Sequence, residues 1–174
     1  MSGLERIKEE FKEILSNPES GVTVGLRDDD YTKWKVTFSG PKDTGYKGGL
    51  FELYIDFPNN YPDMHPEAYF VTPIYHLNVN PSAQKDSGDA PLGKVFSNII
   101  SLWNPKNRIK ELLIEINSFF YKVNPNNAFG IERSKEYMED KAIYYEKTKY
   151  FTKKYANPKN LVKIDPNKDW DFTL

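Results

Sequence analysis

Two stretches, Trp34-Lys35-Val36-Thr37-Phe38 and Phe51-Glu52-Leu53-Tyr54-Ile55-Asp56-Phe57, alternate apolar with mostly polar residues and decide the fold. This period of two is typical of β-strands with one buried face, because successive side chains point to opposite sides of a sheet. Shorter runs at 22–26 and 68–72 extend the pattern to four expected strands. The connecting segments are rich in turn residues and too short for crossover helices, so the sequence predicts an antiparallel meander.

Helical periods flank the expected sheet on both sides. The amino-terminal period is preceded by Ser2 and Glu5, which are spaced as in a capping box. A wide apolar face from Ile109 to Phe120 predicts a central helix packed on the sheet. Residues 132–155 predict one or two further helices. The first stripe comprises Leu4, Ile7, Phe11, Ile14 and Leu15, and the buried contacts expected in the last segment are Tyr137, Met138, Tyr144, Tyr145 and Phe151.

Length and composition bound the class of protein. A chain of 174 residues with 39% hydrophobic content fits one domain with a real core. A formal net charge of -1 gives no electrostatic footprint for nucleic acid or an anionic membrane, so neither partner is expected. No run is long and apolar enough for a secretory signal or a membrane span. The expected location is therefore the cytosol or the nucleus.

The residues needed for several kinds of site are missing. The chain has no cysteine, which excludes disulfides, thiolate metal sites and a thiol nucleophile. His65 and His76 are its two histidines, and no cluster has metal-ligand spacing. Gly48 and Gly49 stand at an expected strand start and are better explained by a turn or bulge than by a phosphate loop. We therefore predict neither a metal nor a cofactor.

Several ordered motifs resemble those of the ubiquitin-conjugating family, over about residues 4 to 157. They are Gly-Pro-Lys-Asp-Thr at 40–44, Tyr-Lys-Gly-Gly at 46–49, Tyr-Pro-Asp-Met-His-Pro at 61–66, Ile-Tyr-His-Leu-Asn-Val-Asn at 74–80, Trp-Asn-Pro at 103–105 and Asn-Pro-Asn-Asn at 124–127. Several motifs in order at compatible spacing are far more specific than any single short pattern.

The resemblance implies an α+β fold of the UBC type. Its expected parts are an amino-terminal helix, the four-stranded antiparallel meander, an irregular active-site loop, a central helix and one or two carboxy-terminal helices. We expect this domain to span residues 1–157 and a carboxy-terminal extension to span 158–174. The last residues, 170–174, have no obvious partner in the domain. The terminal Phe-Thr-Leu at 172–174 is expected to fray, and capture by a peptide-binding module is the alternative.

The resemblance also shows where a nucleophile should be. In the family, a cysteine that follows Gly-x-Ile or Gly-x-Val carries the modifier as a thioester. Aligning residues 93–95 on this pattern puts Phe96 at the cysteine position. A phenyl ring has no nucleophilic lone pair and no labile proton. Ser97 is the adjacent hydroxyl, but it is offset by one place and no activating base is evident, so we predict no catalytic residue.

The remaining residues of the former site are expected to be structural. In the family, the residue matching Asn78 is thought to stabilise an oxyanion with its amide. Here we expect His76 and Asn78 to fix their loop by hydrogen bonds to the backbone. Leu77 replaces the family's proline, which removes a fixed torsion and suggests a less constrained loop. The vestigial site thus comprises His76, Asn78, Phe96 and Ser97.

Residues 81–91 form an insertion relative to minimal family members. Their small and polar composition predicts a mobile loop beside the former active site. A tolerated surface insertion is the simpler interpretation, because added loop length costs little. The alternative is a flap that binds a partner.

The expected docking surfaces also depart from the family. Relatives offer basic residues of the first helix to the activating enzyme, and Glu9 stands here where lysine is common, which implies weakened loading. Asp63 places a carboxylate in the apolar patch that faces ligases, and such a charge opposes burial unless it is paired. The candidate partner-binding residues are Arg6, Lys8, Asp63, Met64, Trp103, Asn104 and Pro105.

Three functions from different classes remain open. The first is a catalytically inactive member of the family that acts as a non-covalent partner or adaptor, similar to ubiquitin-conjugating enzyme variants. Its expected partners are an active conjugating enzyme, ubiquitin or another modifier, or adaptor-complex proteins. The second is a genuine conjugating enzyme whose active cysteine was replaced. The third is a scaffold unrelated to ubiquitin, because a fold does not fix a function.

Overall fold

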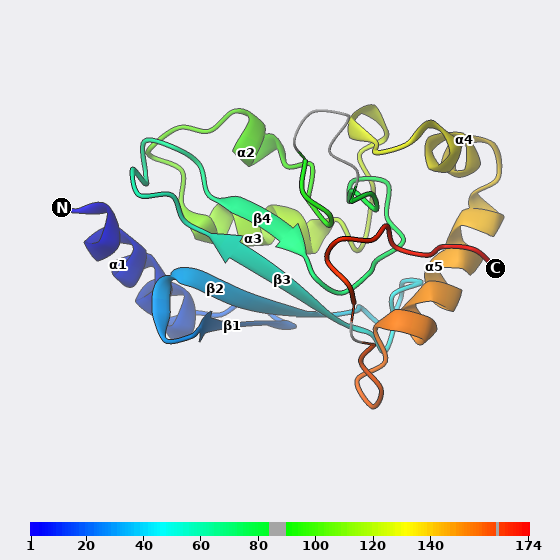
Figure 1. Cartoon of the computed structure of the whole chain (residues 1–174), viewed down its shortest axis with the longest axis horizontal. Helices are drawn as coiled ribbons and strands as arrows, with labels where there is room; N and C mark the ends of the chain where they lie inside the picture. Colours follow the sequence, from blue (N-terminus) through cyan, green and yellow to red (C-terminus); the bar gives the residue numbers. More distant parts are fainter. Residues whose placement is uncertain (84–89, 163) are drawn as a thin grey trace.

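Four strands form one antiparallel sheet in the order β1-β2-β3-β4 (Figure 1). The computed structural model describes residues 1–83, 90–162 and 164–174. The strands are β1 (Val22–Arg27), β2 (Asp30–Ser39), β3 (Leu50–Asp56) and β4 (Glu67–Phe70). The predicted meander is therefore confirmed.

The apolar residues that alternate along the sequence lie opposite one another in neighbouring strands of the sheet. Trp34 pairs with Ile55 and Val36 pairs with Leu53, and all four side chains are fully buried. The tight turn between β1 and β2 places Asp28 and Asp29 in the left-handed region, with φ of 54° and 55°. Two-residue hairpin turns need this conformation, and aspartate tolerates it better than most residues.

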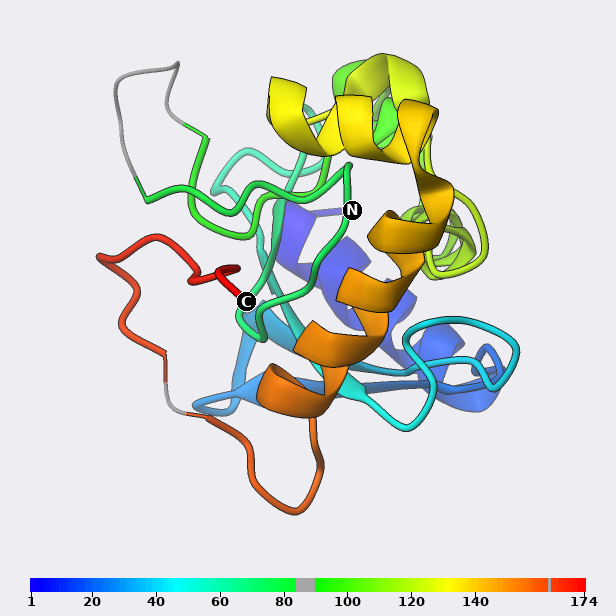
Figure 2. The same cartoon turned by 90° about the vertical axis from the view of Figure 1, so that its right-hand side faces the viewer.

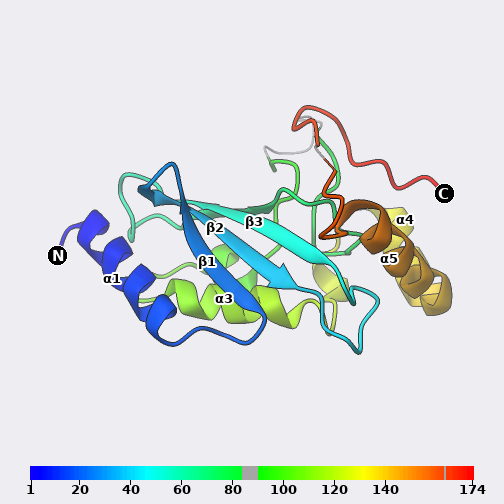
Figure 3. The same ribbon diagram turned by 90° about the horizontal axis from the view of Figure 1, so that it is seen from below.

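The amino-terminal and central helices cover the sheet as expected. Helix α1 (Gly3–Ser16) begins with the predicted capping box, in which the Ser2 hydroxyl accepts from the Glu5 amide at 3.1 Å. Helix α3 (Ile109–Ser118) buries four apolar side chains against the core: Ile109, Leu112, Leu113 and Ile116. Seen from below, α1 lies at one end of the sheet and α3 runs along it (Figure 3).

Two carboxy-terminal helices, α4 (Ile131–Glu139) and α5 (Lys141–Tyr155), lie at the end opposite α1 (Figures 1 and 3). Tyr144 and Phe151 are buried as predicted. The predicted burial of Met138 and Tyr145 is wrong, since they are 65% and 46% exposed. The reason is that α4 buries no residue and α5 buries one face, from which the side chain after Tyr144 turns away.

The buried apolar face of α1 is also narrower than predicted. Ile7 and Ile14 are buried and Phe11 is partly buried, whereas Leu4 and Leu15 are about half exposed. Leu4 and Leu15 therefore lie at the edge of the helix–sheet contact.

Trp170 and Phe172 of the tail pack onto the domain, so the expected fraying is wrong for Phe172, whereas Leu174 is 78% exposed. Trp170 is 6% exposed, and its amide donates to the Pro81 carbonyl at 2.9 Å. The Phe172 ring lies 4.8 Å from that of Phe151 and 5.1 Å from that of Tyr75. Figure 2 shows the tail returning alongside the body after a wide excursion from the end of α5. In the part of the chain that the structure describes, no helix has the length and apolar character needed to cross a membrane.

Candidate functional site

The backbone around Phe96 is held by its neighbour segment. Val95 forms a β-bridge with Val79, and the Phe96 amide donates to the Asn78 carbonyl at 2.8 Å. The half-buried Phe96 ring meets Phe129 edge-on, with the ring centroids 6.0 Å apart. It lines a cleft of about 490 Å³ that is also bounded by His65 and Trp103. The position expected for a nucleophile therefore faces a cleft and carries a hydrocarbon ring.

The Ser97 hydroxyl is occupied by structural hydrogen bonds. Its oxygen caps the short helix α2 (Asn98–Ser101) by accepting from the Ile100 amide at 3.1 Å. The same hydroxyl donates to the Glu115 carboxylate, which also accepts from the Asn98 amide at 2.8 Å. Ser97 is only 2% exposed. Glu115 is thus a carboxylate acceptor that sequence reasoning missed. Ser97 lines the same cleft as Phe96, but its hydroxyl is already engaged by Glu115 and by the Ile100 amide.

The Asn78 side chain uses both amide hydrogens inside the protein. Its Nδ2 donates to the carbonyls of Asn124 and Asn127 at 2.8 and 2.9 Å. Its Oδ1 accepts from the Asn124 amide at 2.8 Å. Because the residue is fully buried, no donor is left for an oxyanion in the cleft. Asn78 therefore ties the segment before Phe96 to the 3₁₀ turn Pro125–Asn127.

Both nitrogens of the His76 ring have fixed partners. Nδ1 accepts from the Asn78 amide at 2.9 Å, which leaves Nε2 to donate to the Phe119 carbonyl at 2.7 Å. This arrangement requires the neutral ring. Burial lowers the pKa of His76 to about 4. An imidazole in this state anchors the loop and does not exchange protons near neutral pH.

The loop that contains Leu77 is firmly held, contrary to the expectation drawn from the missing proline. The Leu77 amide donates to the Tyr144 hydroxyl at 3.0 Å, a hydrogen bond that proline cannot make. The Leu77 carbonyl accepts from the Phe129 amide at 2.8 Å. Its side chain is fully buried in a second core cluster with Tyr75, Tyr144, Phe151 and Tyr155. Packing from α5 thus replaces the constraint that a proline ring would supply.

The insertion is anchored on both of its described flanks. Asn80, which is 7% exposed, places Nδ2 at 3.1 Å from each of the carbonyls of Ser82, Ala90 and Pro91. The Asp169 carboxylate accepts from the Ala83 amide at 2.7 Å. Sequence reasoning missed Asn80 and Asp169, since nothing local marks contacts across such distances in the chain. The middle of the predicted mobile loop, residues 84–89, lies outside the described residues.

The two basic residues expected to meet an activating enzyme behave differently. The Arg6 guanidinium turns inward, where it donates to the carbonyls of Pro105 and Asn107 and pairs with buried Glu10 at 3.4 Å. Lys8 is exposed, with its ammonium 5.2 Å from the Tyr31 ring centroid. Of the pair, Lys8 is therefore the residue placed on the surface.

The candidate ligase-facing residues gather around Trp103, next to the Pro105 carbonyl that Arg6 contacts. The Trp103 indole donates to the Pro62 carbonyl at 2.8 Å and so joins segments 61–66 and 103–105. Met64 is 52% exposed, and Asp63, Asn104 and Pro105 are exposed beside it. None of the ion pairs that described residues form includes Asp63.

Within the described ranges, no group of three or more histidine, aspartate or glutamate side chains could hold a metal ion.

Comparison with known proteins agrees with this geometry. The family model described as ubiquitin-conjugating enzyme matches residues 6–152. A relative from Dictyostelium discoideum named ubiquitin conjugating enzyme E2 B is 31% identical over 156 residues, covering 90% of this chain and 99% of the relative. The chain therefore belongs to the ubiquitin-conjugating enzyme family, although it contains no cysteine.

Proposed function

We propose that this protein is a catalytically inactive member of its family, acting as a non-covalent partner or adaptor in the conjugation of ubiquitin or a ubiquitin-like modifier. The observation that carries the proposal is Phe96 in the place of the nucleophile. Thioester formation needs a thiolate that attacks and later leaves, and a phenyl ring can do neither.

The neighbours of Phe96 support this proposal. The Ser97 hydroxyl caps α2 and is buried, so acyl transfer to it would require breaking the cap. The Asn78 amide has no free donor. The site is therefore organised for rigidity, with its polar groups satisfied by the protein itself.

A surface for partners nevertheless remains. The patch around Met64 and Asn104 is exposed, and the cleft beside Phe96 is open. An adaptor needs such surfaces but needs no reactive group. Lys8 and the ligase-facing residues remain our candidates for these contacts.

The second candidate, a conjugating enzyme whose cysteine was replaced, is favoured by the retained helices α4 and α5 and by the named relative. Against it, the Phe96 ring has an edge-on partner in Phe129, and Leu77 has a hydrogen bond that the family's proline lacks. These accommodations point to a native phenylalanine. The codon at position 96 in the genomic sequence separates the two.

Titration of ¹⁵N-labelled ubiquitin with this protein tests the proposal against an unrelated scaffold. We expect saturable chemical-shift changes confined to one face of ubiquitin. A parallel titration of a labelled, cysteine-containing conjugating enzyme tests pairing with an active partner. If neither labelled protein shows site-specific changes at millimolar concentrations, the proposed role is wrong.

A further inference from the structure

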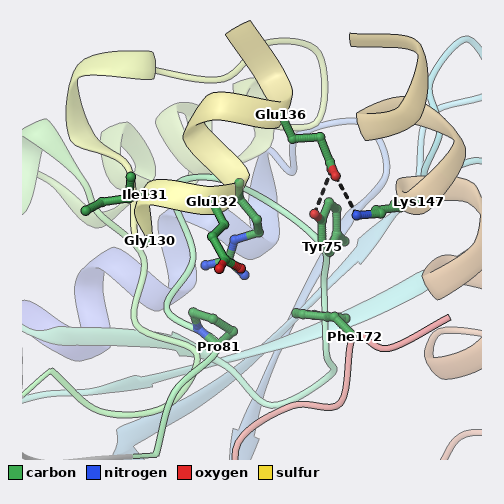
Figure 4. Close-up of a pocket in the computed structure, with 9 residues that line it drawn as sticks. Tyr75, Pro81, Gly130, Ile131, Glu132, Glu136, Lys147 and Phe172 are labelled. Atoms are coloured by element: carbon green, nitrogen blue, oxygen red, sulfur yellow. Dashed lines mark hydrogen bonds and ion pairs between the residues drawn. The ribbon is translucent and has the colours of Figure 1, made fainter. Parts of the chain in front are cut away.

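A second cleft, of about 670 Å³, lies away from Phe96 between α4, α5 and the tail (Figure 4). Its volume falls within the range of about 300–1,000 Å³ that is usual for small-ligand pockets. Tyr75 and Lys147 form one side, Gly130 and Ile131 another, and Phe172 of the tail a third. This cleft plays no part in the function proposed above.

Arg133 lines this cleft as a largely buried cation whose guanidinium carbon lies 5.8 Å from the Tyr75 ring centroid. Its Nη2 donates to the Phe129 carbonyl at 2.6 Å, but its buried Nε has no hydrogen-bond partner. None of the ion pairs formed by described residues includes it. Burial lowers the pKa of Arg133, yet a guanidinium stays protonated near neutral pH. Buried charges are usually paired, so this one is available to a ligand.

The other charges around the cleft compensate Arg133 only in part: the Glu136 carboxylate favours its charged form but forms no ion pair with it. The Glu136 carboxylate accepts from the Tyr75 hydroxyl at 2.8 Å and pairs with Lys147, so both of these charges are already compensated (Figure 4). Helix α4 begins at Gly130 without a side-chain cap, which leaves its positive end towards the same region. Glu132, in the first turn of α4, is exposed and also lines the cleft.

We infer that this cleft binds a monoanionic carboxylate attached to an apolar group, with the guanidinium of Arg133 as its principal contact. The planar guanidinium matches the two oxygens of a carboxylate. Pro81, Ile131 and Phe172 offer apolar surface to the rest of the ligand. A dianionic phosphate fits less well, because the Glu132 and Glu136 carboxylates already line the site.

Phenylacetate is a suitable probe of this inference, with phenylacetamide as its neutral isostere. In ¹⁵N-resolved NMR spectra of the full chain, phenylacetate should cause saturable shifts of the Arg133 Nε–H and the Gly130 amide at millimolar concentrations. Phenylacetamide should cause shifts at least tenfold smaller at equal concentration, and phenyl phosphate should bind more weakly than phenylacetate. Absence of saturable shifts with phenylacetate, or equal binding of the amide, would overturn the inference. Tighter binding of phenyl phosphate would overturn the assignment to a carboxylate.

Variants locate the contact. Arg133→Gln should weaken phenylacetate binding at least tenfold, whereas Lys135→Gln removes the same charge from an exposed position of α4 and should leave binding within twofold. Glu132→Gln should strengthen binding severalfold, because it removes a nearby negative charge without touching the guanidinium. Unchanged binding in a folded Arg133→Gln protein would contradict the site. If Arg133→Gln does not fold, the site is tested by the effect of Glu132→Gln on phenylacetate binding and by the comparison of phenylacetate with phenylacetamide.

Discussion

At the residue scale, the hydroxyl of Ser97 has a structural role. It is the group closest to the missing nucleophile, yet it caps α2 and donates to Glu115. The cap could be predicted from the sequence, because serine directly before a short apolar run is a common helix start. Glu115 could not, because it lies on α3, 18 residues further along.

Replacing Ser97 by alanine should destabilise the protein by about 1–2 kcal/mol, because it removes a helix cap and a hydrogen bond to a carboxylate. Urea unfolding measures the change. Ser101→Ala is the matched control, since Ser101 is exposed and caps no helix; it removes a hydrogen bond from its hydroxyl to the Ser97 carbonyl and should cost about 0.5 kcal/mol. Equal costs at the two positions would show that Ser97 has no special structural role.

His76 makes stability depend on pH with a defined sign. Its pKa is about 4 in the folded protein, below the ordinary value of 6.5. Between these two values, His76 binds a proton more strongly in the unfolded chain than in the folded protein. The contribution of His76 to stability is therefore complete above pH 6.5 and is lost as the pH falls towards 4. The loss amounts to about 3 kcal/mol at about 1.4 kcal/mol per pH unit.

The unfolding free energy of the wild type should therefore fall more steeply from pH 6.5 to 4 than that of His76→Gln. The comparison matters because burial raises the pKa of Glu10, which acts in the opposite direction over the acid part of this range. Parallel pH profiles for the two proteins would show that His76 is not held neutral.

At the scale of elements, the loop 74–80 depends on α5 for its shape. The strands and the central helix could be predicted, because a period of two or 3.6 is a local property of the sequence. The anchoring of Leu77 could not, because its partners Tyr144 and Phe151 are more than sixty residues away. The expectation that the missing proline loosens this loop is therefore wrong.

Leu77→Pro, which restores the family's residue, should destabilise this protein by about 2–4 kcal/mol. It removes a buried amide donor and part of a buried side chain. Thermal and urea unfolding measure the effect. Tyr144→Phe removes only the hydroxyl acceptor and should cost less, and in the double variant the two costs should not add. A neutral or stabilising Leu77→Pro would contradict this account of the loop.

The tail is a second element whose role is set by distant contacts. Trp170, Phe172 and Leu174 alternate with polar residues, but so short a run does not show which distant segment would bury them. In the fold they pack on loop 81–83 and on the cluster around Tyr75.

Trp170→Ala and Phe172→Ala should each lower the unfolding free energy by about 2–4 kcal/mol, as for aromatic residues in a partial core. Leu174→Ala is the control, since Leu174 is 78% exposed and should change stability by about 0.5 kcal/mol or less. If Trp170→Ala is as harmless as Leu174→Ala in urea unfolding, the tail is not docked in solution.

At the scale of the whole molecule, the family fold is retained while Phe96 stands at the position expected for the cysteine. The motifs at 40–49, 61–66 and 103–105 support this architecture, and the comparisons agree with it. The geometry around Phe96 depends on hydrogen bonds that join segments 76–80, 96–98 and 124–127, which no single segment encodes. The sequence therefore predicts the fold in more detail than the site.

Intact-protein mass spectrometry after incubation with activating enzyme, ATP and ubiquitin tests most directly whether this chain recognises a modifier without carrying it. A cysteine-containing conjugating enzyme in a separate, parallel reaction is the positive control. We expect the control to gain one ubiquitin while the mass of this chain stays unchanged, both before and after treatment with a thiol reductant. A ubiquitin adduct on the unaltered chain, whether on Ser97 or elsewhere in the cleft, would contradict the account.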